Sequence, residues 1–265
     1  MSFFQNKVIW ITGASSGIGK ALAIELASKG VQLILSSRKE NELNKIKSEN
    51  KLDDQQCLVL PLDLENTSSI HSLTQKIISH FGRIDVLINN GGISQRSFAK
   101  DTPLDIDRKI MEVNFFGTVA ITKSVLPHMI KQNSGIIVVI SSISGKFGFY
   151  LRSAYAASKH ALHGFFESLR MEVEKNNVQI TIVCPGKIHT DISVNAITAS
   201  GQVNGKMDRS QAEGMSADEC VRIILKAVEN NEEEVFIGGK ELRAIWIKRF
   251  FPKLFSKLIR KQKIE

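Results

Sequence analysis

The chain has 265 residues, of which 43% are hydrophobic and 23% charged, and its formal net charge is +8. This composition fills a sizeable core and excludes a disordered chain, and the length suits one large α/β domain or two small ones. Nine Lys and Arg residues fall within residues 240–265, so the rest of the chain is close to neutral and no nucleic-acid partner is expected.

The first residues lead directly into an apolar run, 8–11, and then into a glycine-rich turn. A signal peptide needs a longer apolar run and a cleavage site, and a membrane-spanning helix needs ~18 apolar residues in succession. The sequence shows neither pattern, and Cys57, Cys184 and Cys220 are far apart and lack CxxC spacing. We therefore expect a cytoplasmic protein with buried, reduced cysteines.

Short β-branched apolar runs alternate with longer amphipathic stretches along the chain. The expected strands are residues 8–11, 32–35, 57–60, 84–88, 135–140, 178–183 and 234–237. The expected helices are residues 18–29, 39–50, 67–81, 104–131, 154–176 and 216–229. Most of these strands are apolar throughout, which is typical of parallel strands covered on both faces. The pattern predicts a doubly wound α/β fold of Rossmann type, with seven mostly parallel strands.

The sequence contains no repeat or linker that would divide residues 1–240, which we expect to form one domain. Within them, residues 191–214 are rich in Ser, Asn, Gly, Thr and Gln and are too long for a simple connection. Long polar loops of this kind often close over a ligand, so this segment is expected to be a substrate lid.

A glycine-rich turn follows the first strand and opens the first helix. It reads Thr12-Gly13-Ala14-Ser15-Ser16-Gly17-Ile18-Gly19, with GxxxGxG spacing. Glycines let the backbone approach a pyrophosphate, which then meets the N–H groups at the positive end of the helix. The position of the turn favours a dinucleotide site over a simple tight turn.

The end of the second strand indicates which dinucleotide binds. An acid there would accept from the ribose 2′-hydroxyl of NAD, whereas a base would pair with the 2′-phosphate of NADP. The run Ser36-Ser37-Arg38-Lys39 contains no acid, and the planar guanidinium of Arg38 suits a phosphate. The sequence therefore predicts NADP(H) as the cofactor.

Residues after the third and fourth strands extend this site. Asp63, beside Leu64, has two alternatives, because its carboxylate can accept from the adenine amine or cap the next turn. Asn90 and Gly91 close the fourth strand, where small residues let the backbone approach the cofactor.

The candidate chemical site contains one of the two tyrosines, Tyr150 and Tyr155. Only Tyr155 has a lysine four residues on, Lys159, which a helix places on the same face. A nearby ammonium lowers the pKa of a phenol from ~10 toward neutrality, so that it can exchange a proton with a carbonyl or alcohol. Ser142, thirteen residues before Tyr155, can bond the same substrate oxygen. Tyr150 is expected to line the pocket.

Together these motifs resemble the short-chain dehydrogenase/reductase family, in its single-domain NADP(H) branch. The resemblance rests on TGxxxGxG, NNGG, NxxG, Ser-Ser, YxxxK and Pro-Gly, in family order over residues 5–240. It implies an oxidoreductase that interconverts a carbonyl and a secondary alcohol, with Tyr155 as acid/base and Ser142 orienting the carbonyl. Lys159 would bind the nicotinamide ribose, and Asn114 would hold a water that leads protons to solvent.

The resemblance also implies a nicotinamide segment at Pro185, Gly186, Ile188 and Thr190, and a homodimer or homotetramer. Two departures stand out: Gly92 replaces the usual alanine, and the glycine turn lacks a basic residue, so that Arg38 carries more of the 2′-phosphate binding. The alternative function is an NADPH sensor or scaffold without turnover. His160 and His163 lack partners at metal-ligand spacing, so no metal site is expected.

Residues 241–265 form a basic amphipathic segment, in which Pro252 is expected to begin a second helix. Two alternatives are open. The segment can lie in the plane of an anionic membrane, or it can pack its apolar face over the substrate cleft or a neighbouring subunit. Phe250, Phe251 and Phe255 favour packing, and an apolar tail near the cleft favours a lipophilic carbonyl or alcohol as substrate.

Overall fold

A computed structural model describes residues 3–261 of the chain. Seven strands form one sheet in the order β3-β2-β1-β4-β5-β6-β7, and all six pairings are parallel. The strands are β1 (Val8–Thr12), β2 (Gln32–Ser36), β3 (Cys57–Val59), β4 (Val86–Asn89), β5 (Gly135–Ile140), β6 (Val178–Pro185) and β7 (Glu234–Ile237). The predicted Rossmann-type sheet is confirmed.

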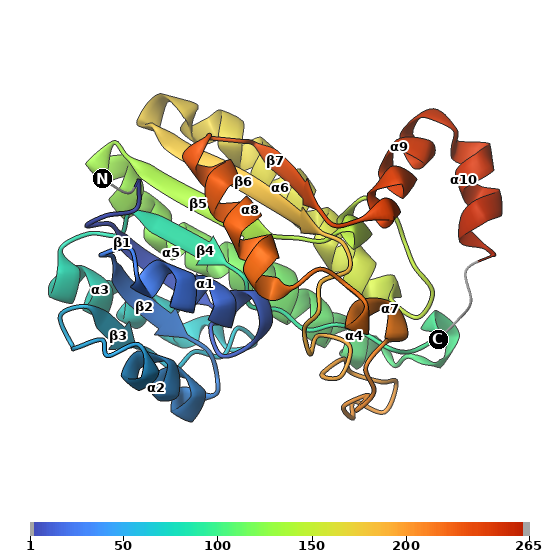
Figure 1. Cartoon of the computed structure of the whole chain (residues 1–265), viewed down its shortest axis with the longest axis horizontal. Coiled ribbons are helices and arrows are strands. Elements are labelled where there is room, and N and C mark those ends of the chain that lie inside the picture. The colour runs from blue at the N-terminus through green and yellow to red at the C-terminus, as the bar shows by residue number, and fades with distance from the viewer. Residues whose placement is uncertain (1–2, 262–265) are drawn as a thin grey trace.

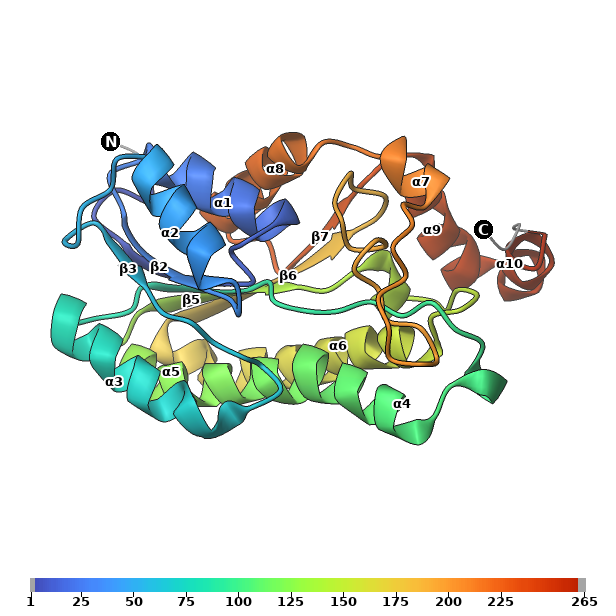
Figure 2. The same ribbon diagram turned by 90° about the horizontal axis from the view of Figure 1, so that it is seen from below.

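Helices cover both faces of this sheet (Figure 2). One face carries α1 (Gly17–Ala27), α2 (Glu40–Glu49) and α8 (Ala217–Glu229). The opposite face carries α3 (Ile70–Phe81), α4 (Leu104–Met111), α5 (Gly117–Gln132) and α6 (Ser153–Val173). The short helix α7 (Arg209–Ala212) lies in the segment predicted to be a lid.

The side chains of β1 show why the strands are apolar at every position. Ile9 and Ile11 join a core that includes Leu22 of α1, whereas Val8 and Trp10 join the core on the other face. All five residues of β1 are buried. Because successive side chains point to opposite faces and both faces are covered, continuous apolar runs replace the alternating pattern.

The strand order reverses beside β1, which pairs with β2 on one side and with β4 on the other. In doubly wound sheets, ligands bind in the crevice outside the carboxyl ends of the strands at this reversal. The glycine turn and the Asn90-Gly91 pair both lie at this crevice.

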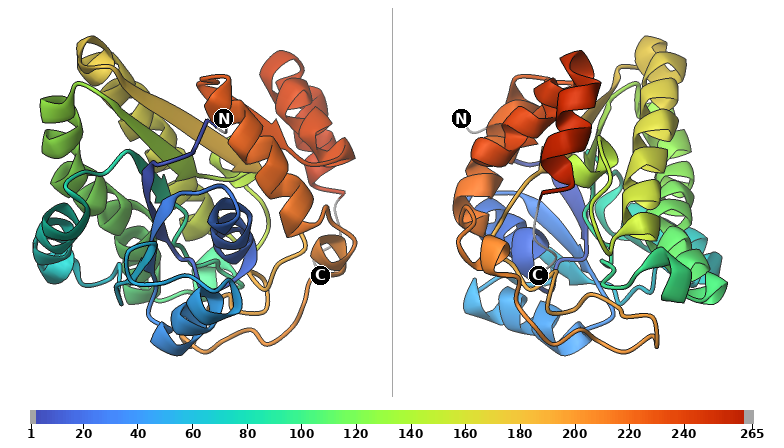
Figure 3. Two further views of the ribbon diagram at one scale, coloured as in Figure 1. Left: turned by 60° about the vertical axis from the view of Figure 1, so that its left-hand side comes forward. Right: turned by 90° about the vertical axis from the view of Figure 1, so that its right-hand side faces the viewer.

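The chain ends in a helical hairpin formed by α9 (Arg243–Phe250) and α10 (Pro252–Ile259). Figures 1 and 3 show these helices, in red, standing apart from the helices that cover the sheet. Pro252 is in the first turn of α10, as predicted. None of the helices within residues 3–261 is both long enough and apolar enough to cross a membrane.

Candidate active site

The carboxyl ends of β1 and β4 are tied together by residues predicted for the nucleotide site. The Thr12 hydroxyl accepts from the backbone N–H groups of Asn90 at 3.1 Å and Gly91 at 3.0 Å. The Asn90 side-chain amide donates to the carbonyls of Thr12 and Gly13, both at 3.1 Å. These bonds hold the glycine turn against the end of β4, at the crevice.

Two glycines of this turn have backbone conformations that favour glycine. Gly13 and Gly17 have φ values of +64° and +52°, in the left-handed region. A Cβ on Gly13 would lie 2.7 Å from the Cα of Gly91, and one on Gly17 would lie 3.2 Å from the Thr190 side chain. With larger residues at these two positions, the turn could not lie so close to Gly91 and Thr190.

The rest of the turn leads into α1. Ser15 precedes Ser16, which is the N-cap residue of α1, and Ile18 and Gly19 lie in its first turn. The first N–H groups of a helix have no partner within the helix, and its dipole is positive at this end. The turn therefore fits the pyrophosphate of a dinucleotide.

The residues predicted to hold the adenosine end lie after β2 and β3. Ser36 is buried and accepts the indole N–H of Trp10 at 2.9 Å, whereas Arg38 is exposed. Asp63 accepts from the backbone N–H of Glu65 at 3.0 Å, so it caps the next turn, which is one of its two predicted alternatives. Leu64 is buried and would touch a Cβ placed on Gly91.

Gln95 fixes the start of α6, the helix that carries Tyr155 and Lys159. Its side chain is fully buried, and its Oε1 accepts from the backbone N–H groups of Ala154 at 2.9 Å and Tyr155 at 3.4 Å. These N–H groups have no partner within the helix, so Gln95 supplies the cap from another segment. The sequence analysis missed Gln95, because no local motif signals a cap that comes from 59 residues away.

Tyr155 and Ser142 form a pair of hydroxyls at the end of β5. The Ser142 hydroxyl lies near enough to the phenol to favour its charged form. Burial raises the pKa of Tyr155, and the positive charges of Arg152 and Arg96, together with the nearby Ser142 hydroxyl, oppose this shift. The net shift is upward, opposite to the lowering that the YxxxK spacing predicts, because desolvation of the phenolate outweighs the surrounding cations.

Lys159 lies one helical turn after Tyr155, with its ammonium 5.8 Å from the centre of the phenol ring. The ammonium donates to the backbone carbonyl of Ile140 at 2.8 Å. Burial lowers the pKa of Lys159 from 10.5 to about 8. The Lys159 ammonium thus bonds β5 and lies near the Tyr155 ring. At neutral pH its charged form is only weakly favoured over the neutral amine.

Asn114 lies in a π-helical turn, Glu112–Phe116, between α4 and α5. It is fully buried; its Oδ1 accepts from the Ile93 N–H at 2.8 Å and its amide donates to the Ile93 carbonyl at 2.9 Å. A Cβ on Gly92 would lie 3.1 Å from the Asn114 Oδ1 and 3.7 Å from the Lys159 Nζ. A side chain at this position would therefore crowd both Asn114 and Lys159, whereas glycine leaves the space beside them open.

The predicted nicotinamide segment, Pro185-Gly186-Lys187-Ile188-His189-Thr190, continues from the end of β6 and is held from two sides. The Glu241 carboxylate accepts from the backbone N–H of Lys187 at 2.9 Å. Burial raises the pKa of Glu241, but this and other backbone N–H donors hold it below its ordinary value. Ile188 pairs with Met215, and Thr190 lies beside Gly17. The segment is thus brought to the glycine turn.

A cavity of about 420 Å³ opens beside Ser142. Phe147 and Tyr150 line it, as do the guanidinium groups of Arg96 and Arg152. Tyr150 is therefore part of the pocket wall, as predicted. The cavity wall thus combines aromatic side chains with two cations, Arg152 and Arg96, whose positive charge also opposes the rise in the pKa of Tyr155.

Asp208 fastens the segment 191–214 to this cavity. Its carboxylate pairs with Arg96 and, at 2.8 Å, with Arg152, and all three side chains are at least three-quarters buried. Its backbone N–H donates to the Ser193 hydroxyl at 3.1 Å. The segment predicted to be a lid thus contributes to the cavity wall through residues that the sequence analysis did not single out.

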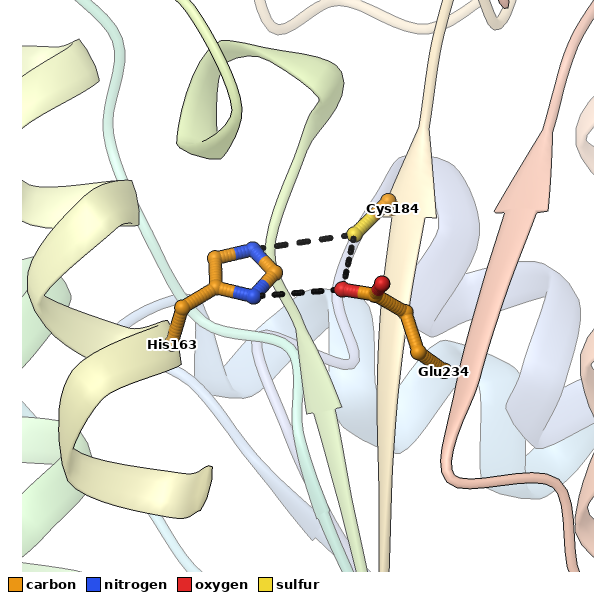
Figure 4. A group of neighbouring side chains, drawn as sticks. All are labelled: His163, Cys184 and Glu234. Atoms are coloured by element: carbon orange, nitrogen blue, oxygen red, sulfur yellow. Dashed lines mark hydrogen bonds and ion pairs between the residues drawn. The ribbon is translucent and has the colours of Figure 1, made fainter. Parts of the chain in front are cut away.

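A second polar cluster consists of His163 of α6, Cys184 of β6 and Glu234 of β7 (Figure 4). His163 Nε2 lies 3.1 Å from the Ser141 hydroxyl and 3.7 Å from the Cys184 thiol, and Nδ1 lies 3.3 Å from a Glu234 oxygen. Within residues 3–261, this is the one group of His, Cys and acid donors close enough to hold a metal. Burial raises the pKa of Cys184, and Lys146 already pairs with Glu234. His163 Nδ1 has no hydrogen-bond partner within the described residues and faces the Glu234 carboxylate only at ion-pair distance.

Comparison with known proteins gives consistent matches over most of the chain. A family model described as short chain dehydrogenase matches residues 7–200. The chain is 41% identical over 264 residues to a dehydrogenase/reductase SDR family protein 7-like of Anopheles gambiae, covering 97% of this chain and 83% of that protein. It is 44% identical to dehydrogenase/reductase SDR family member 7 of Homo sapiens, covering 88% and 70%.

Solved structures share the fold. A short-chain dehydrogenase/reductase from Burkholderia phymatum, solved in complex with NAD, has a TM-score of 0.84 at 23% identity and covers 96% of both chains. Levodione reductase has a TM-score of 0.79 at 26% identity and covers 90% of this chain and 98% of its own.

Proposed function

Because the chain belongs to the short-chain dehydrogenase family of oxidoreductases, we propose that it interconverts a carbonyl and a secondary alcohol with NADP(H). Tyr155 is the acid/base of this reaction. The observation that carries the proposal is the proximity of the Ser142 and Tyr155 hydroxyls, with Ser142 on the wall of the cavity. A carbonyl oxygen bound there meets two hydroxyls at once.

The chain's residues have separate roles in this reaction. The bound nicotinamide supplies or accepts the hydride. In reduction, the Tyr155 hydroxyl donates its proton to the substrate oxygen, and Ser142 holds that oxygen by a hydrogen bond. Lys159 holds the nicotinamide ribose, and its positive charge favours the phenolate when the proton leaves. Asn114, close to Lys159 across Gly92, holds the water through which Tyr155 regains a proton.

The choice of NADP(H) rests on Arg38. It is exposed just after β2, in the run Ser36-Ser37-Arg38-Lys39, which contains no acid that could accept from a ribose 2′-hydroxyl. An Arg guanidinium pairs well with a 2′-phosphate. The glycine turn and the N-terminus of α1 would hold the pyrophosphate between this end and the nicotinamide segment.

The substrate we propose is a lipophilic carbonyl or alcohol. The cavity beside Ser142 has aromatic walls from Phe147, Phe149 and Tyr150. Arg96 and Arg152 also reach the cavity, but Asp208 already pairs with both. The aromatic part of this mixed wall would contact the apolar part of the substrate.

The test is Tyr155→Phe, compared with Tyr150→Phe as a matched control. NADPH oxidation is followed over steroid, acyl-chain and small aldehyde substrates. Tyr155→Phe is expected to lower turnover by ~10²–10⁴ while NADPH affinity is retained, because general acid catalysis contributes that much. Tyr150→Phe removes a hydroxyl at the cavity wall and is expected to stay within about threefold of the wild type.

Two results would contradict the proposal. Turnover by Tyr155→Phe close to that of the wild type would remove Tyr155 as the proton donor. Tight NADPH binding by the wild type, with no oxidation across the whole panel, would favour a sensor or scaffold over an enzyme.

A further inference from the structure

The α9–α10 hairpin carries large apolar side chains that the rest of the described chain leaves uncovered. Trp246 is 59% exposed, Phe250 65% and Phe251 62%, and Leu254 and Leu258 are also exposed. The Trp246 and Phe250 rings stack with centroids 6.2 Å apart, and Leu254 and Leu258 are one helical turn apart. Apolar surface gathered in this way on one element marks an interaction site.

The same hairpin is strongly basic. Between Leu242 and Lys261 the sequence has no Asp or Glu. The bases in this stretch are Arg243, Lys248, Arg249, Lys253, Lys257, Arg260 and Lys261, and all of them are exposed. The uncovered aromatic side chains therefore lie among positive charges that no acid of the hairpin neutralises.

Other residues of the hairpin contact the rest of the domain. The Phe255 ring packs edge-on against Phe147 with centroids 5.1 Å apart, and the Lys248 ammonium donates to the Lys146 carbonyl. Before α9, Glu241 binds the backbone N–H groups of Lys187 and Gly239. These contacts leave the side chains of Trp246, Phe250 and Phe251 largely exposed. Packing on the domain thus accounts for the apolar side chain of Phe255, but not for those of Phe250 and Phe251.

The charge of the hairpin indicates which kind of partner can bind its exposed apolar side chains. A second copy that met it about a twofold axis would bring the same positive charges against themselves, which is unfavourable. Aromatic and aliphatic side chains among Lys and Arg are the composition that lies at a lipid–water interface and attracts anionic headgroups. We propose that the α9–α10 hairpin docks this protein on an anionic lipid surface.

Docking would bring the cavity to the membrane. Glu241 and Ala244, at the start of the hairpin, line the same cavity as Ser142 and Phe147. A lipophilic substrate could then reach the cavity from the bilayer. This last step rests on the proposed function, whereas lipid binding itself needs neither cofactor nor turnover.

The test measures co-sedimentation of the full-length protein with vesicles of phosphatidylcholine alone or mixed with phosphatidylserine. Wild type should bind the mixed vesicles and not the neutral ones, and high salt should release it. Lys253→Gln/Lys257→Gln/Arg260→Gln should weaken binding by more than tenfold, since each base near such a surface contributes about fivefold. Phe250→Ser/Phe251→Ser should lose binding as well.

Matched controls remove equal charge and apolar surface elsewhere. Lys131→Gln/Lys175→Gln/Lys226→Gln alters three exposed lysines of the body, and Leu104→Ser/Met171→Ser alters two exposed apolar side chains. Both should bind like the wild type, and unchanged circular dichroism and NADPH affinity should show that every variant is folded. If the phenylalanine variant fails to fold, the charge variant still decides the result.

Three results would overturn the proposal. These are equal binding to neutral and anionic vesicles, no binding to either, or a concentration-dependent dimer that Phe250→Ser/Phe251→Ser abolishes. The last would assign the face to a second copy. Failure of the proposed function would instead appear as vesicle binding by a protein that never oxidises NADPH, so the two failures are distinguishable.

Discussion

Burial acts on Tyr155 and Lys159 in opposite directions. It raises the pKa of the phenol and lowers that of the ammonium to about 8, so both groups are pushed toward their neutral forms. A neutral phenol is the form that donates a proton to a carbonyl. Lys159, in contrast, is still mostly charged at neutral pH, and keeping this charge in a buried site destabilises the folded protein.

This cost gives a prediction for Lys159→Met. The unfolded lysine keeps its pKa of 10.5, so the buried site penalises the folded state fully below pH 8 and no longer above pH 10.5. The variant is therefore expected to be more stable than wild type at pH 7 by roughly 1–3 kcal/mol, or several degrees in Tm. The gain should shrink toward pH 10, while carbonyl reduction is lost.

Thermal melts of both proteins at pH 7, 8.5 and 10 check this expectation, since other titrating groups affect both alike. A Lys159→Met protein that is less stable than wild type at pH 7, or a difference that does not change with pH, would contradict it. Lys159→Arg keeps the charge and is expected to lack the gain.

The candidate site could be read from the sequence where its residues are local in the chain. Tyr155 and Lys159 are four residues apart on one helix, and the glycine turn is continuous, so local spacing is enough to propose them as site residues. Gln95 and Asp208 act through contacts across the fold, on α6 and on Arg96 with Arg152. A pattern within one segment cannot show which distant backbone or guanidinium a side chain will meet.

At the scale of elements, the segment 191–214 depends on one acid. Asp208 pairs with two largely buried guanidinium groups, so removing its charge takes an ionic partner from each of them. Breaking a buried ion pair costs up to about 3–5 kcal/mol. Much of that cost should appear locally, as loosening of the loop from the cavity.

Asp208→Asn is therefore expected to raise KM for the carbonyl substrate and to speed proteolysis within residues 191–207, with little change in NADPH affinity. Glu213→Gln is the control, because its pair with Arg209 is exposed and contributes little. Limited proteolysis and steady-state kinetics measure both effects. Equal cleavage of Asp208→Asn and wild type would show that the loop is held by its backbone contacts instead.

The helices and strands also show which structural details a sequence pattern predicts and which it misses. Continuous apolar runs locate the strands well, because both faces of the sheet are covered. The stretch 104–131 reads as one helix, but a π-helical turn at Glu112–Phe116 interrupts it and places Asn114 next to Ile93. One wide turn shifts the apolar period too little to be seen, and π-turns of this kind often lie at functional sites.

At the scale of the molecule, the crevice joins segments that are distant in the chain. Arg38 stands at one end and Thr190 at the other, and a dinucleotide that spans them would bridge β2, β1 and β4. A ligand that binds only the folded protein stabilises it by about 2.7 kcal/mol at a hundred times its Kd. For a chain of this size, that is a rise in Tm of roughly 5–10 °C.

NADPH is accordingly expected to raise Tm more than NADH does at equal concentration, because a charge-assisted bond to the 2′-phosphate contributes ~1.5–3 kcal/mol. Arg38→Ala should remove most of the difference, whereas Lys39→Ala, its exposed neighbour, should keep it. Differential scanning fluorimetry with each cofactor measures the shifts. Equal shifts for both cofactors in the wild type would assign Arg38 another role.

The two tryptophans of the sequence stand at opposite extremes of environment. Trp10 is fully buried and bonded to Ser36, whereas Trp246 is 59% exposed on the hairpin. Their emission therefore reports on different events: Trp10 on loss of the core, and Trp246 on transfer of the hairpin from water to another medium. Trp10→Phe would leave Trp246 of α9 as the single tryptophan, whose emission should shift to the blue and resist aqueous quenchers when the hairpin reaches lipid. The chain thus carries its own optical probe at the surface where a probe is most useful, with no label to disturb it.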